Sequence, residues 1–276
     1  MTMSDEKDAI SFQGKRVVVA GGGGTGMGAA ATSLLTALGA EVVVLDRREP
    51  QIDVAAFHRT DLGDAEAIDT TVASIPEPVH ALLNCQGVSG AAPGTAPEDV
   101  MRVNFLGVRH LSEAILPSIT EGGAVVRISS AGGLGWTRRL EEIQELLDSA
   151  DFEEGLRWCE EHADALLVPV FPKSYSFSKQ ALIVWTMRRA ASAIEAGVRI
   201  NCSSPGSTET AMAGDFPEEG VRYMNRPIGR GSSPTEQAWP VVFLASSAAS
   251  YVNGANLVVD GGNAAARTLG LLTTSV

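Results

Sequence analysis

The chain of 276 residues has little of several residue types, and each shortage excludes a class of protein. Its three cysteines, Cys85, Cys159 and Cys202, are scattered and fit neither a disulfide framework nor a zinc site. The four histidines share no ligand spacing, so we predict no metal site. Lys and Arg are outnumbered by Asp and Glu, and the net charge of −12 argues against nucleic-acid and anionic-membrane partners.

Long apolar runs are lacking as well. No stretch approaches the roughly 20 apolar residues that a membrane helix needs. The first residues, MTMSDEKDAI, are polar and acidic and lack the apolar core of a signal peptide. We therefore expect a cytoplasmic protein with a flexible tail at 1–12. The hydrophobic content of 45% is ordinary, and the remaining residues, 13–276, suit one domain with a sizeable core.

What the chain does contain is a regular alternation of strand and helix patterns. KRVVVA (15–20) and EVVVLD (41–46) are buried strand patterns that flank a helical stretch, 29–38, and the three have the size of one βαβ unit. Further strand patterns occur at 55–62, 79–85, 122–130, 198–204 and 256–262, and helical patterns at 64–74, 99–117, from 175 onward and near 234–246. This order predicts an α/β fold, a single doubly wound Rossmann domain with a parallel sheet and right-handed crossovers.

A glycine-rich stretch, GGGGTGMG (21–28), follows the first predicted strand and opens a helix. Gly22, Gly26 and Gly28 would let the backbone turn tightly and approach a pyrophosphate, which the helix N-terminus would bind. The alternative is a tight turn without a ligand. The context of the stretch favours the phosphate-binding loop.

Asp46, 18 residues after Gly28, is the main element of that context. A carboxylate at the end of the second strand accepts hydrogen bonds from ribose hydroxyls and repels a 2′-phosphate, so we predict NAD as the cofactor. The neighbouring Arg47 and Arg48 keep NADP open as an alternative.

Tyr175 and Lys179 stand one helical turn apart in FPKSYSFSKQALIVW (171–185), at the start of a run typical of a buried helix. A free tyrosine, with a pKa near ~10, is too weak an acid for reversible catalysis at neutral pH, and an ammonium one turn away should lower that pKa. On an exposed helix such a pair is common. Preceded by the glycine loop and by a strand ending in Ser129–Ser130, it indicates proton transfer to a substrate oxygen.

Together these features resemble the short-chain dehydrogenase/reductase family over almost the whole chain. The loop is similar to the family's Thr-Gly-x-x-x-Gly-x-Gly with Gly21 in the threonine position, and Tyr-x-x-x-Lys is matched by Tyr175 and Lys179. The stretch 84–87, Asn-Cys-Gln-Gly, matches Asn-Asn-Ala-Gly only at its ends. The resemblance implies cofactor contacts at Gly22, Thr25, Gly26, Met27, Gly28, Asp46, Asp61, Leu62, Asn84, Gln86, Gly87, Tyr175, Lys179, Pro205, Gly206, Thr208 and Thr210.

The same resemblance implies four catalytic residues, Asn104, Ser130, Tyr175 and Lys179. Tyr175 would act as the acid in ketone reduction and as the base in alcohol oxidation. Ser130 would hold and polarise the substrate oxygen. Asn104 would interrupt its helix to bind a water that links Lys179 to solvent.

The segment 132–173 does not fit the alternation and is predicted to be a helical insertion before the tyrosine helix. Ser130 and Tyr175 are 45 positions apart, whereas in most family members a short loop separates them. Because the insertion begins and ends beside these residues, its apolar positions suit a lid over a hydrophobic substrate. Trp136 and Phe171, with Met212 from a later loop, are the predicted substrate contacts; the alternative is that the apolar positions only pack the insertion onto the domain.

Within the family, the insertion most resembles that of the 3α-hydroxysteroid dehydrogenase/carbonyl reductase branch. The resemblance implies an NAD-dependent oxidoreductase that interconverts a bulky hydrophobic secondary alcohol and its ketone. An aryl or coniferyl-type alcohol dehydrogenase is the alternative. A catalytically silent NAD-binding sensor is a third reading, disfavoured because all four catalytic residues are present. We expect a homo-oligomer, a dimer or a tetramer, with no nucleic-acid or membrane partner.

Overall fold

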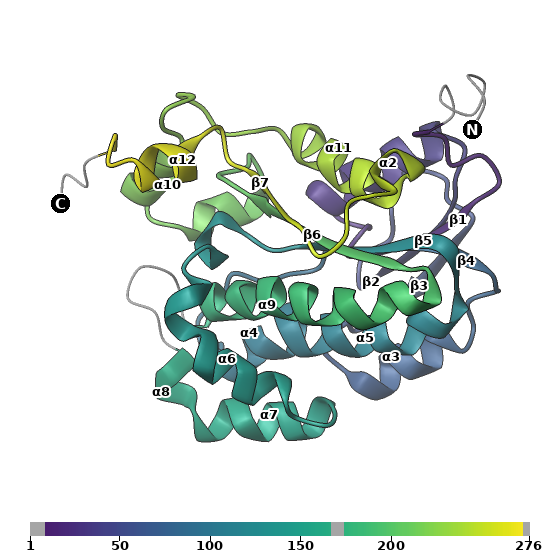
Figure 1. The fold of residues 1–276 in the computed structure, drawn as a ribbon, viewed down its shortest axis with the longest axis horizontal. Coiled ribbons are helices and arrows are strands. Elements are labelled where there is room, and N and C mark those ends of the chain that lie inside the picture. Colours follow the sequence, from purple (N-terminus) through teal and green to yellow (C-terminus); the bar gives the residue numbers. More distant parts are fainter. Residues whose placement is uncertain (1–8, 167–173, 273–276) are drawn as a thin grey trace.

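One parallel sheet forms the centre of the computed structural model, which describes residues 9–166 and 174–272. Its strand order, β3-β2-β1-β4-β5-β6-β7, confirms the doubly wound prediction (Figure 1). The order reverses between β1 and β4, which creates a crevice at the carboxyl ends of these strands. The strands are β1 (Arg16–Ala20), β2 (Glu41–Asp46), β3 (Ala56–Arg59), β4 (Val79–Asn84), β5 (Ile119–Ile128), β6 (Arg199–Pro205) and β7 (Asn256–Val259).

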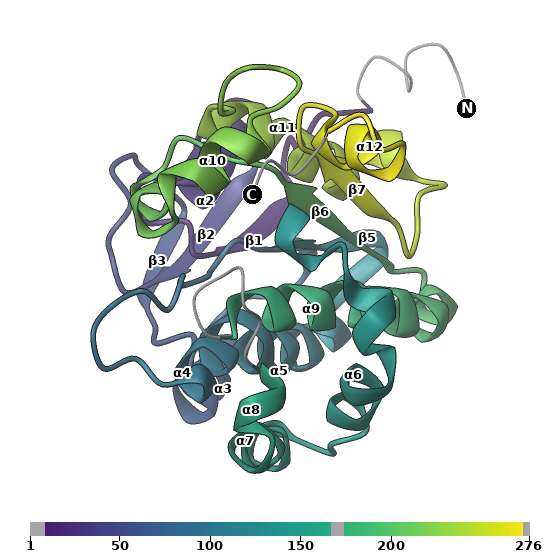
Figure 2. The same ribbon diagram turned by 90° about the vertical axis from the view of Figure 1, so that its left-hand side faces the viewer.

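Helices cover both faces of the sheet, because its central strands are apolar on both sides. On one face lie α2 (Met27–Ala37) and α11 (Pro234–Ala245), and on the other α3 (Ala65–Val72), α5 (Gly107–Ile115) and α9 (Tyr175–Ala193) (Figure 2). Successive side chains of a strand point to opposite faces. Val17 and Val19 therefore pack with α2 and α11, whereas Val18 packs in the core on the α3, α5 and α9 side.

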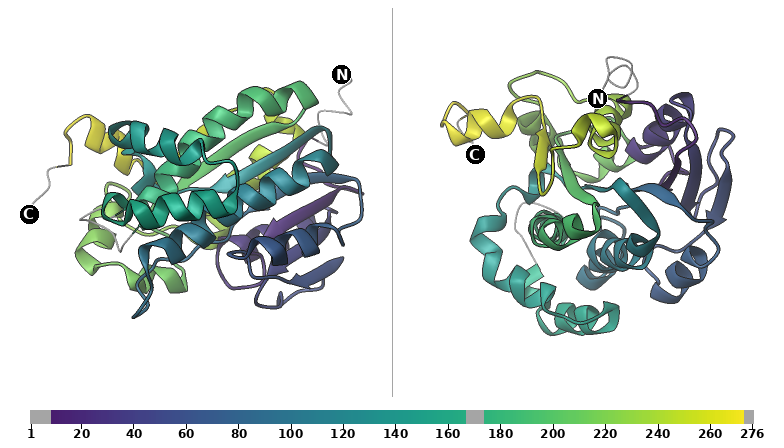
Figure 3. Two further views of the ribbon diagram at one scale, coloured as in Figure 1. Left: turned by 90° about the horizontal axis from the view of Figure 1, so that it is seen from below. Right: turned by 45° about the vertical axis from the view of Figure 1, so that its right-hand side comes forward.

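The predicted insertion is helical and lies outside the layer of α9 and α5, where its helices appear in teal in Figure 3. Its described helices are α6 (Leu140–Leu147), α7 (Phe152–Glu161) and α8 (Ala163–Leu166). Three further helices lie outside the insertion: α4 (Pro97–Met101), α10 (Glu218–Met224) and α12 (Asn263–Thr268). Asp151 caps α7 by accepting a hydrogen bond from the Glu154 amide at 2.8 Å. None of the described helices is long and apolar enough to cross a membrane.

A third hydrophobic cluster joins the insertion to the domain. Ile143 and Leu147 of α6 are buried in this cluster with Phe105, which precedes α5, and with Phe177 of α9. Packing onto the domain, the alternative to a lid, thus accounts for these two apolar positions of the insertion. Trp136 packs against the same cluster and stays partly exposed; the lid remains a prediction.

The flexible tail predicted over 1–12 extends too far. Phe12 is fully buried in the core beneath α2 and α11, and its amide donates to the Leu38 carbonyl at 3.0 Å. Ala9 is also held, because its carbonyl accepts a hydrogen bond from the Ala248 amide at 3.0 Å. The prediction was based on the polar residues at the start of the chain and overlooked Phe12, which packs into the core.

Candidate active site

Ser130, Tyr175 and Lys179 come together at the carboxyl end of β5. Ser130 lies two residues after the end of the strand, and Tyr175 is the first residue of α9. A hydrogen bond joins Tyr175 to Ser130. The Lys179 ammonium lies 5.7 Å from the centroid of the Tyr175 ring and donates to the Ile128 carbonyl at 3.0 Å. The spacing of four residues predicted that Tyr175 and Lys179 share one face of a helix. The end of β5 brings Ser130 to the same place.

Asn104 lies beside this group, in a π-helical segment (Arg102–Leu106) that interrupts the helix between α4 and α5. Its side-chain carbonyl accepts from the Val88 amide at 2.8 Å, and its side-chain amide donates to the Val88 carbonyl at 2.9 Å and to Ser178 Oγ at 3.2 Å. A Cβ on Gly87 would lie 3.4 Å from Asn104 Oδ1 and 3.5 Å from Lys179 Nζ. These neighbours place all four predicted catalytic residues in one site.

Burial dominates the electrostatics of the tyrosine and lysine. The pKa of Tyr175 is raised because the phenol is buried, and the hydrogen bond with Ser130 only partly opposes that shift. The sequence had predicted the opposite direction for this pKa. The difference arises because the phenol is itself buried, which the helical spacing does not reveal. Burial also lowers the pKa of Lys179 to about 8.

The glycine loop forms a cradle at the crevice. A Cβ on Gly28 would lie 2.1 Å from the Gly21 carbonyl oxygen, and one on Gly22 would lie 2.7 Å from Thr32 Oγ1, so both positions require glycine. Gly26 is the N-cap of α2 and makes no side-chain cap hydrogen bond, which leaves the first turn of the helix without a side-chain acceptor. Such a terminus fits a phosphate.

Asp46 lies directly beside this loop. One of its carboxylate oxygens accepts from the Gly23 amide at 2.9 Å and the other from the Arg48 amide at 2.9 Å. A Cβ on Gly23 would lie 1.7 Å from the Arg48 carbonyl oxygen. The sequence did not single out Gly23, because this close approach depends on a turn more than twenty residues away. Arg47 points to Asp61, with 3.9 Å between the charged atoms.

The other predicted cofactor residues fall into two groups. Leu62 and Met27 pack in the hydrophobic cores. Asn84 donates to Ser112 Oγ at 3.1 Å, and its side-chain oxygen is buried without a hydrogen-bond partner among the described residues. By contrast, both polar atoms of the Gln86 amide are buried without a hydrogen-bond partner among the described residues. An unsatisfied buried amide beside the cradle fits a polar ligand.

The turn after β6 forms the opposite wall of the crevice. Thr210 lies here, and its methyl carbon is 4.0 Å from the position of a Cβ on Gly26. At Gly206 a Cβ would lie 2.8 Å from the Asp260 Cα, so the turn is closely packed against the end of β7. Thr208 is buried, and its hydroxyl lies 3.1 Å from Ser232 Oγ. Thr25 is exposed at the tip of the glycine loop.

Two contacts at the substrate side were not foreseen. Ser89 Oγ donates to Asp215 Oδ2 at 2.5 Å and so connects the segment after β4 with the segment that contains Met212. The ring of Phe216 packs edge-on against the ring of Tyr175, with centroids 5.4 Å apart. Phe171 lies outside the described residues. No pattern in the sequence relates Ser89 to Asp215, 126 positions away, or Tyr175 to Phe216, so these contacts could only be seen in the structure.

Metal ligands are not assembled anywhere in the described ranges: they contain no group of three or more His, Cys, Asp or Glu side chains that could hold a metal ion. The polar groups of the site are instead a phenol, an ammonium, hydroxyls and amides. Groups of these types can bind a substrate oxygen and transfer a proton.

The comparisons with known proteins agree with this arrangement. A model of the short chain dehydrogenase family matches residues 15–138, and a model described as enoyl-(acyl carrier protein) reductase matches residues 164–264. Coniferyl-alcohol dehydrogenase of Pseudomonas sp. (strain HR199) is 35% identical over 260 residues, which cover 92% of this chain and 98% of that protein. The 3-alpha-hydroxysteroid dehydrogenase/carbonyl reductase of Comamonas testosteroni is 34% identical over 253 residues, with 89% and 95% covered.

Among solved structures, the 3-alpha-hydroxysteroid dehydrogenase from Pseudomonas sp. B-0831 complexed with NADH is similar, with a TM-score of 0.75 and 25% identity. The match covers 94% of this chain and all of that one. The chain belongs to the short-chain dehydrogenase/reductase family. It is a dehydrogenase that acts on CH–OH groups.

Proposed function

We propose that the protein interconverts a bulky aryl alcohol of the coniferyl type and its carbonyl product, with NAD as the cofactor. The observation that carries this proposal is the similarity to coniferyl-alcohol dehydrogenase along nearly the whole of both chains. The ring of Phe216 against Tyr175 supports it, because an aromatic wall at the reacting group favours a flat aromatic substrate. The sequence had put a hydroxysteroid first; the similar hydroxysteroid dehydrogenase keeps that substrate as the second candidate.

The residues of the site divide the chemistry among them. When bound, the nicotinamide cofactor accepts or donates the hydride. Tyr175 takes the hydroxyl proton during alcohol oxidation and returns it during carbonyl reduction. Ser130, hydrogen-bonded to Tyr175, holds the substrate oxygen beside the phenol. Lys179, whose ammonium lies 5.7 Å from the centroid of the Tyr175 ring, would favour the phenolate form of Tyr175 while it carries its proton.

The preference for NAD rests on Asp46. Its carboxylate stands at the end of β2 beside Gly23, where a 2′-phosphate would meet a like charge. Arg47, the cation that would favour NADP, is largely exposed and lies near Asp61. A homo-oligomer is part of the same proposal. Because α6 packs against α9, the insertion covers part of the α9 surface and leaves less of it for contacts between subunits, which favours a dimer over a tetramer.

A panel of alcohols tests the proposal. We expect turnover of coniferyl-type aryl alcohols with NAD at a kcat/KM at least about tenfold above that for hydroxysteroids. Tyr175→Phe should lower kcat by about 10²- to 10⁴-fold, because the proton-transfer group is lost, and should change the Kd for NADH far less. Tyr251→Phe is the control, since Tyr251 is fully exposed.

Three outcomes decide among the candidates. Faster turnover of hydroxysteroids would replace the aryl alcohol by the second candidate. Full activity in Tyr175→Phe would refute the assigned acid/base. Binding of NAD without turnover of any alcohol would point to the sensor.

A further inference from the structure

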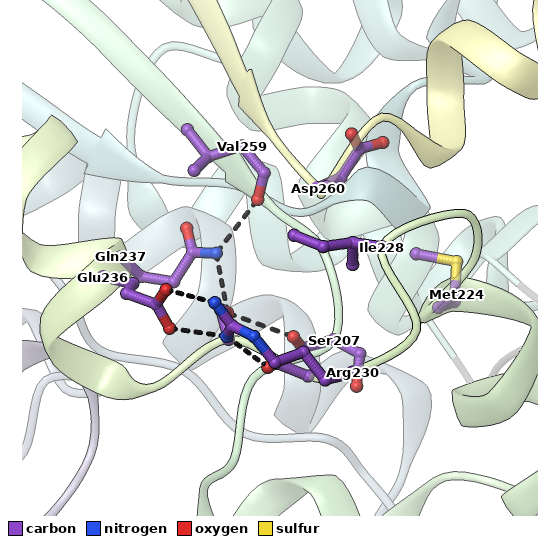
Figure 4. Close-up of a pocket in the computed structure, with 11 residues that line it drawn as sticks. Ser207, Met224, Ile228, Arg230, Glu236, Gln237, Val259 and Asp260 are labelled. Atoms are coloured by element: carbon purple, nitrogen blue, oxygen red, sulfur yellow. Dashed lines mark hydrogen bonds and ion pairs between the residues drawn. The ribbon is translucent and has the colours of Figure 1, made fainter.

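Gln237 is a buried polar side chain of α11 that lies behind the turn after β6, and none of the sequence motifs gave it a role. It is 2% exposed and lines a cavity of about 120 Å³ between α11, the end of β7 and the loop before α11 (Figure 4). The next residues on this face of the helix, Ala238 and Val241, are apolar members of the core. A buried amide among apolar neighbours is costly unless it is hydrogen-bonded.

The side-chain amide of Gln237 donates two hydrogen bonds. One goes to the Val259 carbonyl at 2.9 Å and the other to Ser232 Oγ at 2.8 Å, and Figure 4 shows the first of them reaching the end of β7. The Val259 carbonyl also accepts a hydrogen bond from the Gly206 amide at 3.0 Å. Gln237 and Gly206 therefore share one acceptor.

Ser232, the second partner, contacts the other end of the same turn. Its hydroxyl lies 3.1 Å from Thr208 Oγ1 and 3.1 Å from the Ser207 carbonyl. Its backbone carbonyl accepts from the Glu209 amide at 2.8 Å, and its own amide donates to the Ser207 carbonyl at 2.9 Å. Gln237 thus reaches Gly206 through Val259 and Thr208 through Ser232.

Only the donor atom of the Gln237 side chain makes hydrogen bonds to the described residues. Its side-chain oxygen has no hydrogen-bond partner among the described residues, whereas its nitrogen makes both contacts. An apolar side chain of equal size would fill the same space and leave the Val259 carbonyl and Ser232 hydroxyl without this bridge. Space filling alone therefore does not account for glutamine at 237.

We propose that Gln237 is a positioning residue that holds the turn 205–209 in the shape required to bind the nicotinamide end of the cofactor. The inference rests on the proposed function, because it is the family resemblance that makes this turn a cofactor contact. The turn stands across the crevice from the glycine loop, with Thr210 opposite Gly26, so a shift of the turn changes the width of the crevice.

The first test uses the protein without cofactor. Gln237→Met keeps the volume of the side chain and removes both donors. We expect the Glu209 and Ser232 amides to exchange hydrogen about tenfold faster in this variant, since their bonds depend on the position of Ser232. Val241→Ala is the control, because it removes a fully buried side chain from the same helix without touching the turn.

The second test measures binding. In Gln237→Met we expect the KM for NAD to rise about 5- to 20-fold and kcat to change less than about twofold, while Val241→Ala leaves KM unchanged. Ser232→Ala should raise KM similarly. The double variant should add little to either single one, because both changes break the same connection.

Unchanged amide exchange and unchanged KM in Gln237→Met would overturn the inference. Faster exchange with an unchanged KM would also overturn it, because the turn would then not matter to the cofactor. If the unaltered protein bound neither NAD nor NADP, the proposed function would fail instead, and that outcome is visible before any variant is made.

Discussion

Replacing Lys179 by methionine should change how the stability of the cofactor-free protein depends on pH. Lys179 is 3% exposed, and among the described residues its ammonium has one hydrogen bond, to the Ile128 carbonyl. Burial lowers its pKa from 10.5 to about 8, so the folded protein loses this proton at a lower pH than the unfolded chain does. Between these two values the unfolded state binds more protons, and stability must rise with pH.

The size of the effect follows from the two pKa values. Lys179 destabilises the fold most below pH 8, and the penalty disappears as the pH rises toward 10.5. Linkage over the interval from pH 7 to 9.5 gives a gain of about 2 kcal/mol in the free energy of unfolding. For a chain of this size the gain corresponds to about 4 to 8 °C in Tm. Methionine has no proton to lose, so Lys179→Met should lack this part of the pH dependence.

Urea unfolding of both proteins at pH 7, 8, 9 and 9.5 measures the difference directly, because the contributions of unrelated groups cancel. Arg157→Met is the control, since it removes an exposed cation from α7. A difference between unaltered protein and Lys179→Met that stays constant across this range would refute the reasoning. It would mean that the ammonium is solvated or paired well enough to keep an ordinary pKa.

Two further predictions concern the cofactor and the insertion. Asp46→Asn should raise the ratio of kcat/KM for NADP to kcat/KM for NAD by about tenfold or more, because the charge that repels a 2′-phosphate is gone. Asp53→Asn, at an exposed position, controls for the change in net charge. An unchanged ratio in Asp46→Asn would mean that Asp46 does not determine the choice of cofactor. Ile143→Ala should lower the free energy of unfolding by about 2 to 5 kcal/mol in one transition, because Ile143 is fully buried between α6 and the domain. The exposed Glu145→Ala should have little effect, and a separate early transition of the insertion would contradict the shared core.

The sequence predicted most of the sheet because its signals are local. β2 has the predicted bounds, Glu41–Asp46, and β1 and β4 differ from the prediction by one residue at one end. In these strands, runs of β-branched and apolar residues end at glycine or polar residues, and neither signal depends on distant parts of the chain. Tyr175 and Lys179 were predictable for the same reason, since four residues make one helical turn.

The sequence by itself therefore determined the α/β alternation, the glycine loop and the spacing of the catalytic pair. Tertiary structure alone decided that Asn104 bonds to Ser178, that Phe216 packs on Tyr175 and that Gln237 braces the turn after β6. It also reversed the expected direction of the Tyr175 pKa, because burial is a property of the packed site. Periodicity and turn residues act over a few positions, whereas burial and contacts between distant segments exist only once the layers have packed together.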